Sequence, residues 1–119
     1  MKTTRGDVVL LDHPFSDASG SKVRPVLVVQ ANARNAILAD TIVALITKNT
    51  RNVATDRTQI LIDLATPDGR ISGLNINSAV KCGSLYTVHE NHIIKKIGKL
   101  SSALMDEVDD GLKTALELP

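Results

Sequence analysis

Cysteine and aromatic side chains are nearly absent from this chain of 119 residues. Cys82 is the single cysteine, so an internal disulfide is excluded and no cysteine cluster can hold zinc. Phe15 and Tyr86 are its whole aromatic content, since tryptophan is missing. Because proteins that bind bases by stacking need aromatic platforms, this mode of nucleic-acid recognition is disfavoured.

Long apolar runs and a strong net charge are lacking as well. No run approaches the roughly 18 apolar residues that cross a bilayer, and residues 1–6 contain no apolar secretory core. We therefore expect a cytoplasmic protein that does not bind membranes. The net charge of +1 gives no general attraction to nucleic acid, so any such site must come from local clustering of lysine and arginine.

The length and composition are sufficient for one folded domain over residues 1–119. A hydrophobic content of 43% and a mean hydropathy of +0.04 are typical of a globular protein that buries its core without disulfides or metals. We expect no cofactor and no bound metal.

The most informative stretch is residues 24–30, with the sequence RPVLVVQ. Pro25 fixes its own φ, lacks an N–H and biases the residue before it toward extended geometry. The apolar residues 26–29 face both sides of a strand, which is typical of a central strand buried on both faces. The pattern therefore predicts that Arg24 is a cation held in one pose at the mouth of a rigid strand.

The remaining pattern predicts short strands followed by a helix. Residues 13–23 form a polar stretch that is long for a hairpin loop and typical of a binding loop, and a second polar loop covers residues 48–56. Residues 93–100 are ambiguous between strand and helix. We predict strands at 6–12, 23–30, 41–47 and 58–63, one further strand or a bent pair at 78–88, one helical turn within 31–38, and a turn at 66–69.

The C-terminal segment has the clearest helical pattern. Ser101 is a suitable N-cap, and Leu100 before it can pack on Met105 as a hydrophobic staple. The outward positions are acidic, which favours a solvated face over a partner-docking surface. The apolar face that should dock on the strands consists of Leu104, Val108, Leu112 and Leu116.

Five segments in order carry a resemblance to a known family: RGDVVLLD, RPVLVVQ, TIVALIT, SAVKC with LYTV, and IGKLSSALMDEVDDGL. Over residues 5–118 the chain resembles the MazF/PemK family of type II toxin-antitoxin endoribonucleases. The resemblance implies a mainly β fold with α, namely a small SH3-like (MazF/CcdB-type) β-barrel with a C-terminal helix. It also implies a homodimer, a cognate antitoxin partner, and metal-independent cleavage of single-stranded RNA (mRNA) at short preferred sequences.

In this family the arginine of the arginine-proline step and the threonine that ends the next strand line the active site, which implies catalytic roles for Arg24 and Thr47. Attack of a ribose 2′-hydroxyl on the adjacent phosphate develops charge on a pentacoordinate phosphorus, which the paired N–H donors of an arginine can stabilise. A threonine hydroxyl both donates and accepts, so it can orient a phosphate oxygen or the attacking hydroxyl. The alternatives are a surface arginine in an ion pair and a strand-edge threonine bonded to the backbone.

Four further residues are candidates for substrate binding. Ser21 and Lys22 precede Arg24 where the family has a glycine-rich substrate loop, and Lys48 follows Thr47. Ser78 matches a serine that often lies near the active site in relatives. The alternatives are solvated lysines and a plain strand-start serine.

Histidine and cysteine chemistry is not expected here. His13 lies where relatives usually carry an apolar residue, and His89 and His92 flank a polar turn without a third metal ligand. Cys82 has no neighbouring base in the sequence, which favours a small buried side chain over a nucleophile.

The chain departs from many relatives after Cys82. Relatives often read CDQ.RT, with an acid and a second arginine, whereas this chain reads CGSLYT with Gly83 and Tyr86 at those positions. A mechanism that relies on that acid cannot operate here, and the general base is left unassigned. The alternative function is a non-catalytic SH3-like barrel that binds protein or nucleic acid, as in the related gyrase-inhibiting toxins.

Overall fold

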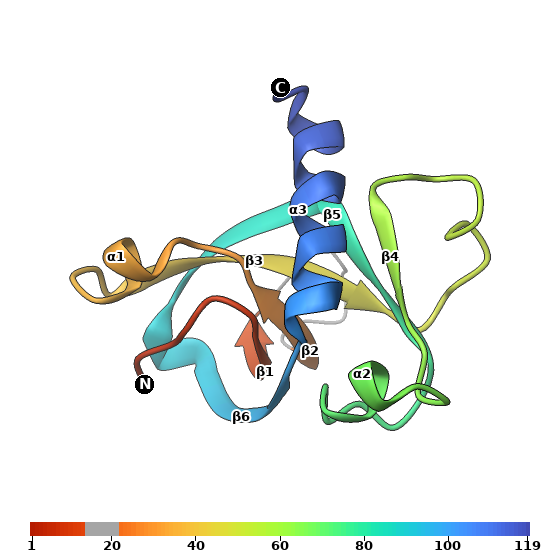
Figure 1. The fold of residues 1–119 in the computed structure, drawn as a ribbon. Coiled ribbons are helices and arrows are strands. Elements are labelled where there is room, and N and C mark those ends of the chain that lie inside the picture. The colour runs from red at the N-terminus through yellow and green to blue at the C-terminus, as the bar shows by residue number, and fades with distance from the viewer. Residues whose placement is uncertain (14–21) are drawn as a thin grey trace.

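Six antiparallel strands form one sheet in the order β4-β5-β3-β2-β1-β6 (Figure 1). The computed structural model describes residues 1–13 and 22–119. The elements along the chain are β1 (Asp7–His13), β2 (Lys22–Val28), α1 (Asn32–Asn35), β3 (Asp40–Thr47), β4 (Gln59–Ile62), α2 (Pro67–Arg70), β5 (Ser78–His89), the 3-10 turn η1 (Glu90–His92), β6 (Ile93–Lys99) and α3 (Ser102–Leu116).

Strand β2 lies inside the sheet, between β1 and β3, as its apolar run predicts. Val26 and Val28 belong to one buried cluster, and Leu27 and Val29 belong to a second cluster on the other face. Because successive side chains of a strand point to opposite faces, β2 is enclosed on both sides. This burial makes β2 the rigid element that carries Arg24.

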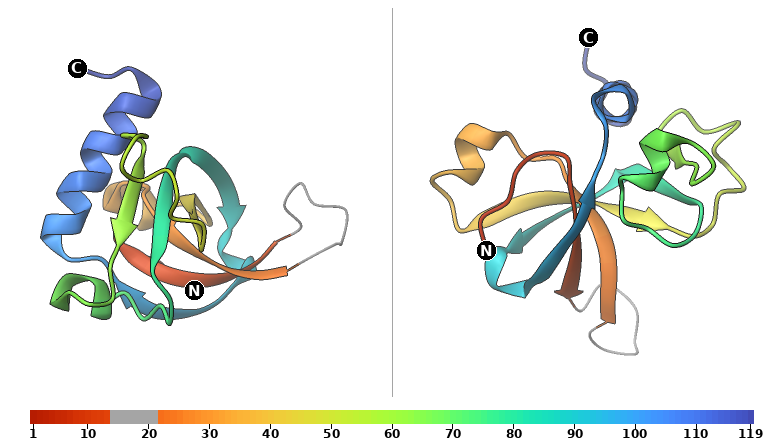
Figure 2. Two further views of the ribbon diagram at one scale, coloured as in Figure 1. Left: turned by 90° about the vertical axis from the view of Figure 1, so that its right-hand side faces the viewer. Right: turned by 60° about the horizontal axis from the view of Figure 1, so that its bottom comes forward.

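The fold class predicted from the sequence is confirmed, with a mainly β architecture and a C-terminal helix. The described strands form an open sheet in which β4 and β6 are the two edges, rather than a fully closed barrel. Strand β5 bends because Lys81 pairs with Leu45 while Leu85 pairs with the adjacent Ala44, which leaves residues 82–84 as a bulge. Figure 2 shows the resulting curvature of the sheet beside α3.

Two local predictions change in the structure. The turn expected at residues 66–69 is the start of the short helix α2, because Pro67 occupies its first turn and the Thr66 side chain accepts a hydrogen bond from the Gly69 N–H at 3.0 Å. The ambiguous segment 93–100 forms the strand β6 over Ile93–Lys99, which pairs with β1.

Helix α3 begins as predicted. The Ser101 hydroxyl accepts a hydrogen bond from the Leu104 N–H at 3.2 Å, and Leu100 and Met105 contact the same core cluster. The helix packs on β4 and β5. The expected apolar face stops short of Leu116, which is 53% exposed because the last turns extend beyond the sheet (Figure 1).

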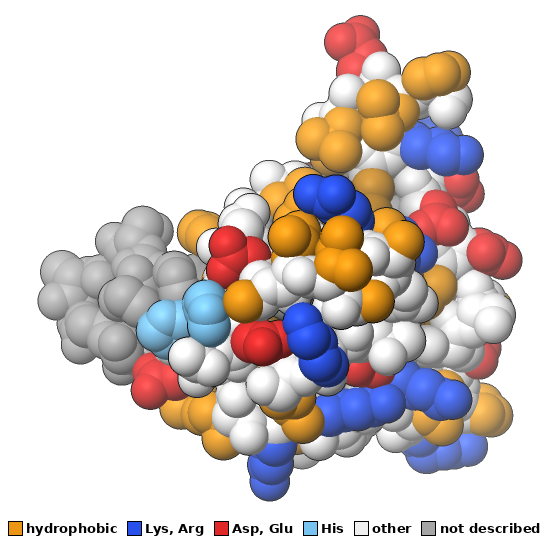
Figure 3. All heavy atoms as spheres, turned by 90° about the vertical axis from the view of Figure 1, so that its left-hand side faces the viewer, with side chains coloured by type: hydrophobic (Ala, Val, Ile, Leu, Met, Phe, Trp, Pro, Cys, Tyr) orange, Lys and Arg blue, Asp and Glu red, His pale blue; other side chains and the backbone are white. Residues whose placement is uncertain are grey.

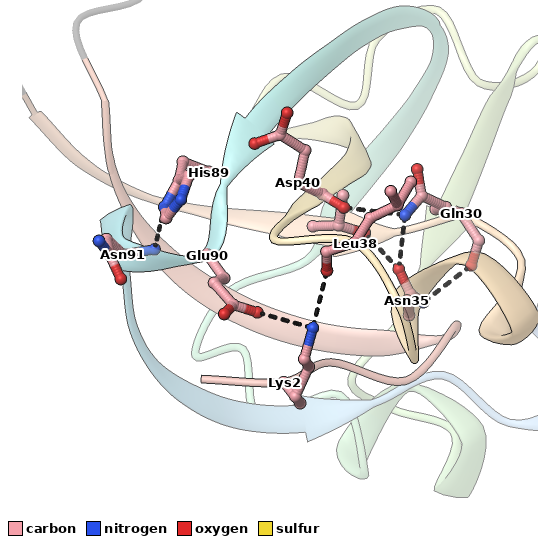
Figure 4. Close-up of polar contacts among 9 residues, drawn as sticks. Lys2, Gln30, Asn35, Leu38, Asp40, His89, Glu90 and Asn91 are labelled. Carbon is pink, nitrogen blue, oxygen red and sulfur yellow. Dashed lines mark hydrogen bonds and ion pairs between the residues drawn. The ribbon is translucent and has the colours of Figure 1, made fainter.

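A buried polar cluster fixes the connection between β2 and β3 at the end of β2 remote from Arg24 (Figure 4). Gln30 Nε2 donates to Asn35 Oδ1 at 3.0 Å and to the Asp40 carbonyl at 2.9 Å. Asn35 Nδ2 in turn donates to the Gln30 carbonyl, and the Thr41 hydroxyl donates to Asn35 Oδ1 at 2.8 Å. These satisfied bonds replace hydration that the buried amides lose, so the connection is held in one conformation.

The surface carries charges of both signs, in keeping with the small net charge. Figure 3 shows several lysine and arginine side chains gathered along the lower part of one face, with acidic side chains scattered above them. Among residues 1–13 and 22–119, no helix is both long and apolar enough to cross a membrane.

The contact between α3 and β5 generates a stability prediction. A Cβ at Gly111 would lie 2.8 Å from Cys82 Sγ and 3.3 Å from Ile60 Cδ1, so Gly111→Val overpacks the core. We expect this substitution to lower the free energy of unfolding by about 1–3 kcal/mol, measured by urea denaturation.

The matched control is Gly83→Val, because a Cβ at Gly83 meets nothing within 4 Å. Its effect should stay within about 0.5 kcal/mol. Equal effects at the two glycines would contradict the close packing of α3 on β5.

Candidate active site

The pairing of β2 with β3 brings the two predicted catalytic residues together. Val26 pairs with Leu45, and Val28 pairs with Val43. Continuing this antiparallel register by two residues places Arg24 opposite Thr47, where the two strands leave the core. Both residues are half-buried, and both line one pocket of about 690 Å³.

The pocket combines an apolar wall with positive charge. Three cations line it, namely Arg24, Lys48 and Lys95, and its described lining contains no aspartate or glutamate. A concave site lined by positive charges attracts anions even when the protein as a whole is nearly neutral. The apolar part of the lining consists of Leu10, Val23, Pro25, Ile46, Leu74, Ile76 and Ile97.

One wall of the pocket is the segment between α2 and β5. It approaches β6 closely at Gly73, whose φ of +76° places it in the left-handed region. A Cβ there would overlap the Ile97 carbonyl, so glycine is required both by the conformation and by the close approach. This contact places Leu74, Asn75 and Ile76 along the pocket.

Four of the six residues predicted for the site therefore share one pocket: Arg24, Thr47, Lys48 and Ser78. Ser21 lies outside the described residues. Lys22 begins β2 and pairs with His13 of β1, and nothing is described of its side chain.

The two hydroxyl groups of the site differ in what they can offer a ligand. Thr47 Oγ1 accepts a hydrogen bond from the Asn49 N–H at 3.1 Å, which leaves its own hydrogen to donate into the pocket. Ser78 is only 2% exposed, and its hydroxyl donates to the Ile76 carbonyl at 2.9 Å. Ser78 thus fixes the wall at Ile76, while Thr47 keeps a donor for a ligand.

Lys95 is the pocket cation that the sequence reasoning missed. The segment 93–100 could be read as strand or helix, so the position of its lysines was undefined. Once β6 pairs with β1, Lys95 lies opposite Leu10 and reaches the pocket. The signal that could have found it is the alternation of the segment as a strand beside β1.

Cys82 is a core residue, as predicted. It is fully buried, and its Sγ donates to the Val108 carbonyl at 3.8 Å. Burial, with a smaller contribution from the charge of Asp56, raises the pKa of the Cys82 thiol to about 11. The pKa of Asp56 is lowered by hydrogen bonds from the Thr58 hydroxyl and N–H.

The residues that depart from the pattern of relatives lie away from this pocket. Neither Gly83 nor Tyr86 is among its described lining residues, and Gly83 lies in the β5 bulge. His89 forms a turn with Asn91, whose N–H donates to His89 Nδ1 at 3.0 Å (Figure 4). Within the described part of the chain, no three histidine, cysteine, aspartate or glutamate residues gather in a group that could hold a metal ion.

Comparison with known proteins defines the family. The model of the PemK-like, MazF-like toxins of type II toxin-antitoxin systems matches residues 4–116. The chain belongs to this toxin family. Its relatives in the PemK/MazF family include the endoribonuclease MazF6 of Mycobacterium tuberculosis, which is 33% identical over 99% of this chain and 100% of the relative. The endoribonuclease EndoA of Bacillus subtilis is 30% identical over 99% of this chain and 97% of its own length.

Solved structures of MazF proteins share the fold. A mycobacterial endoribonuclease in complex with its cognate antitoxin is 26% identical, with a TM-score of 0.79 over 98% of this chain and 97% of that one. The toxin MazF-mt6 of Mycobacterium tuberculosis, at 22% identity and a TM-score of 0.76, covers 95% of this chain and 98% of its own. The open sheet with a C-terminal helix is therefore a MazF-like fold.

The state of Cys82 generates a second prediction. Because folding raises the pKa of its thiol from about 9 to about 11, the native state binds more protons than the unfolded state between these values. The contribution to stability is complete below pH 9 and is lost as the pH rises toward 11. Urea unfolding at several pH values should show this fall in the wild type and a smaller fall in Cys82→Ala.

A thiol reagent gives an independent measurement of the same burial. At pH 8, iodoacetamide should modify Cys82 much more slowly in the folded protein than in urea. Equal rates in the two states would contradict the assignment of Cys82 to the core.

Proposed function

We propose that this pocket is the RNA-cleaving centre of a metal-independent, sequence-selective endoribonuclease toxin, formed as a single domain over residues 1–119. The observation that carries the proposal is the meeting of Arg24 and Thr47 in one cation-lined pocket without acidic lining residues. The relatives named as endoribonucleases favour this function over a non-catalytic barrel.

Arg24 stabilises the reacting phosphate. The 2′-oxygen of the preceding ribose loses its proton and attacks the phosphorus, the bond to the leaving 5′-oxygen breaks, and that oxygen gains a proton, which yields a 2′,3′-cyclic phosphate and a 5′-hydroxyl without net change in protons. The guanidinium presents paired N–H donors to the equatorial oxygens, where negative charge develops in the transition state. Its attachment to the doubly buried strand β2 means that little reorganisation is needed when the charge forms.

Thr47 and Lys48 complete the contacts to the substrate. The Thr47 hydroxyl is positioned by the Asn49 N–H and donates its hydrogen to a non-bridging phosphate oxygen. Lys48, which is exposed at the end of β3, adds a positive charge for the RNA backbone. Ser78 supports the wall that faces the nucleotide through its bond to Ile76.

The likeness to toxins of this class also supports a cognate antitoxin, a homodimer and action in the cytoplasm. The solved mycobacterial endoribonuclease is held by its antitoxin. The edge strands of the described sheet, β4 and β6, present backbone N–H and C=O groups that a second chain can cover.

Light scattering tests the homodimer. It should give about twice the 12.7 kDa mass of the chain at micromolar concentration, and detection of the monomer alone would contradict the homodimer.

Cleavage of a long unstructured RNA in the presence of a chelator tests the catalytic assignment. We expect Arg24→Ala to reduce the cleavage rate by at least about 100-fold, because a preorganised donor to the transition-state charge is lost. Thr47→Val should cost roughly 10- to 100-fold, as expected for one hydrogen bond to a charged oxygen, and Thr47→Ser should retain most activity.

The matched control is Arg34→Ala. Arg34 is exposed on α1, beyond the other end of β2, and does not line the pocket. Cleavage by Arg24→Ala at the rate of Arg34→Ala, or intact RNA with the wild type, would overturn the catalytic reading.

A further inference from the structure

Strand β6 supplies a cation to the pocket from the side opposite to Thr47. Lys95 pairs with Leu10 of β1, and Leu10 pairs with Pro25 of β2. Since neighbouring strands lie about 4.8 Å apart, the backbones of Lys95 and Pro25 are separated by roughly 10 Å. On the far side of β2 lies β3 with Thr47, so the two ends of the pocket are defined by different strands.

Lys95 differs from the adjacent Lys96 of β6 in how its charge is used. Lys96 Nζ lies 3.0 Å from Asp7 Oδ1, in an ion pair with a carboxylate that is largely buried. Lys95 is exposed, lines the pocket and makes no side-chain hydrogen bond or ion pair with any described residue. Its charge is therefore available to a ligand, whereas that of Lys96 is used within the fold.

We propose that Lys95 binds a phosphate of the RNA strand that flanks the scissile phosphate held by Arg24 and Thr47. This inference rests on the proposed function and deepens it. The compact ammonium of a lysine contacts a backbone phosphate without selecting a base. Because Arg24 and Lys95 line the same pocket from β2 and β6, one RNA strand that runs across β2, β1 and β6 presents neighbouring phosphates to the two cations.

The proposal adds a third substrate cation to the pocket, after Arg24 and Lys48. Lys95 provides this positive charge from β6. The apolar residues Leu10, Pro25 and Ile97 on the same three strands give the intervening ribose and base an uncharged surface.

Binding of a non-cleavable RNA tests the proposal separately from catalysis. A 2′-O-methyl oligonucleotide lacks the attacking hydroxyl and is not cleaved. Its affinity can therefore be measured by fluorescence anisotropy at salt concentrations from about 0.05 to about 0.3 M. Each phosphate contact to a single strand contributes about 0.7 to the slope of log K against log salt. We expect Lys95→Gln to reduce this slope by about 0.7 and to weaken binding roughly fourfold at 0.15 M salt.

The matched variants are Lys99→Gln and Lys95→Arg. Lys99 is exposed on the same strand but does not line the pocket, so its substitution should leave slope and affinity at wild-type values. Lys95→Arg keeps the charge and should restore both. A slope of Lys95→Gln equal to that of Lys99→Gln overturns the role of Lys95, whatever the cleavage activity.

The remaining outcomes separate this inference from the proposed function. If Lys95→Gln shows the reduced slope while the wild type leaves cleavable RNA intact, Lys95 is an RNA contact and the catalytic proposal fails. If the wild type does not bind RNA, both fail. A scan with one neutral methylphosphonate linkage at a time locates the contact. When the linkage next to the scissile one is neutral, Lys95→Gln should no longer weaken binding relative to the wild type. If this loss of effect occurred only with a neutral scissile linkage, the proposal would be contradicted.

Discussion

The burial of β2 on both faces is the constraint on which the rest of the structure depends. Residues 26–28 of β2 and Val29 directly after it belong to two separate buried clusters, so β2 cannot shift in register without exposing one of them. The register with β3 is thereby fixed, and continuing it by two residues beyond Val26 and Leu45 brings Arg24 opposite Thr47. At the other end of β2, the buried bonds between Gln30, Asn35 and Thr41 hold the connection to β3. Arg24 and Thr47 are held accurately because the strands that carry them are fixed by core packing and by these buried hydrogen bonds.

Electrostatic attraction in this protein is local. A net charge of +1 provides no long-range attraction for RNA, yet Arg24, Lys48 and Lys95 line one pocket with no acid in its described lining. Other positive groups serve the fold: Lys96 pairs with Asp7, Arg5 pairs with Asp109 at 2.6 Å, and Lys2 contacts Glu90 (Figure 4). The gathering of these three cations in one pocket gives a nearly neutral chain a specific site for an anionic polymer.

Local patterns in the sequence predicted most of the fold, and long-range pairing explains what they missed. The apolar run after Pro25 identified the central strand, and Ser101 with Leu100 identified the start of α3, because both signals lie within a few residues. The nature of segment 93–100 depended on its pairing with β1, which is remote in sequence, so Lys95 was not recognised. The family resemblance placed Arg24, Thr47, Lys48 and Ser78, which the pocket brings together, whereas the bulge that carries Gly83 away from the pocket has no local signature.

The chemistry of the RNA ends tests the central claim most directly. If the 2′-hydroxyl attacks the phosphate held by Arg24 and Thr47, mass spectrometry of the products formed with a chelator present will show a 2′,3′-cyclic phosphate on one fragment and a 5′-hydroxyl on the other. This outcome follows from which P–O bond forms and which breaks. Products with a 3′-hydroxyl and a 5′-phosphate would require that water attacks the phosphorus and that the bond to the 3′-oxygen breaks. They would contradict the mechanism assigned to this pocket.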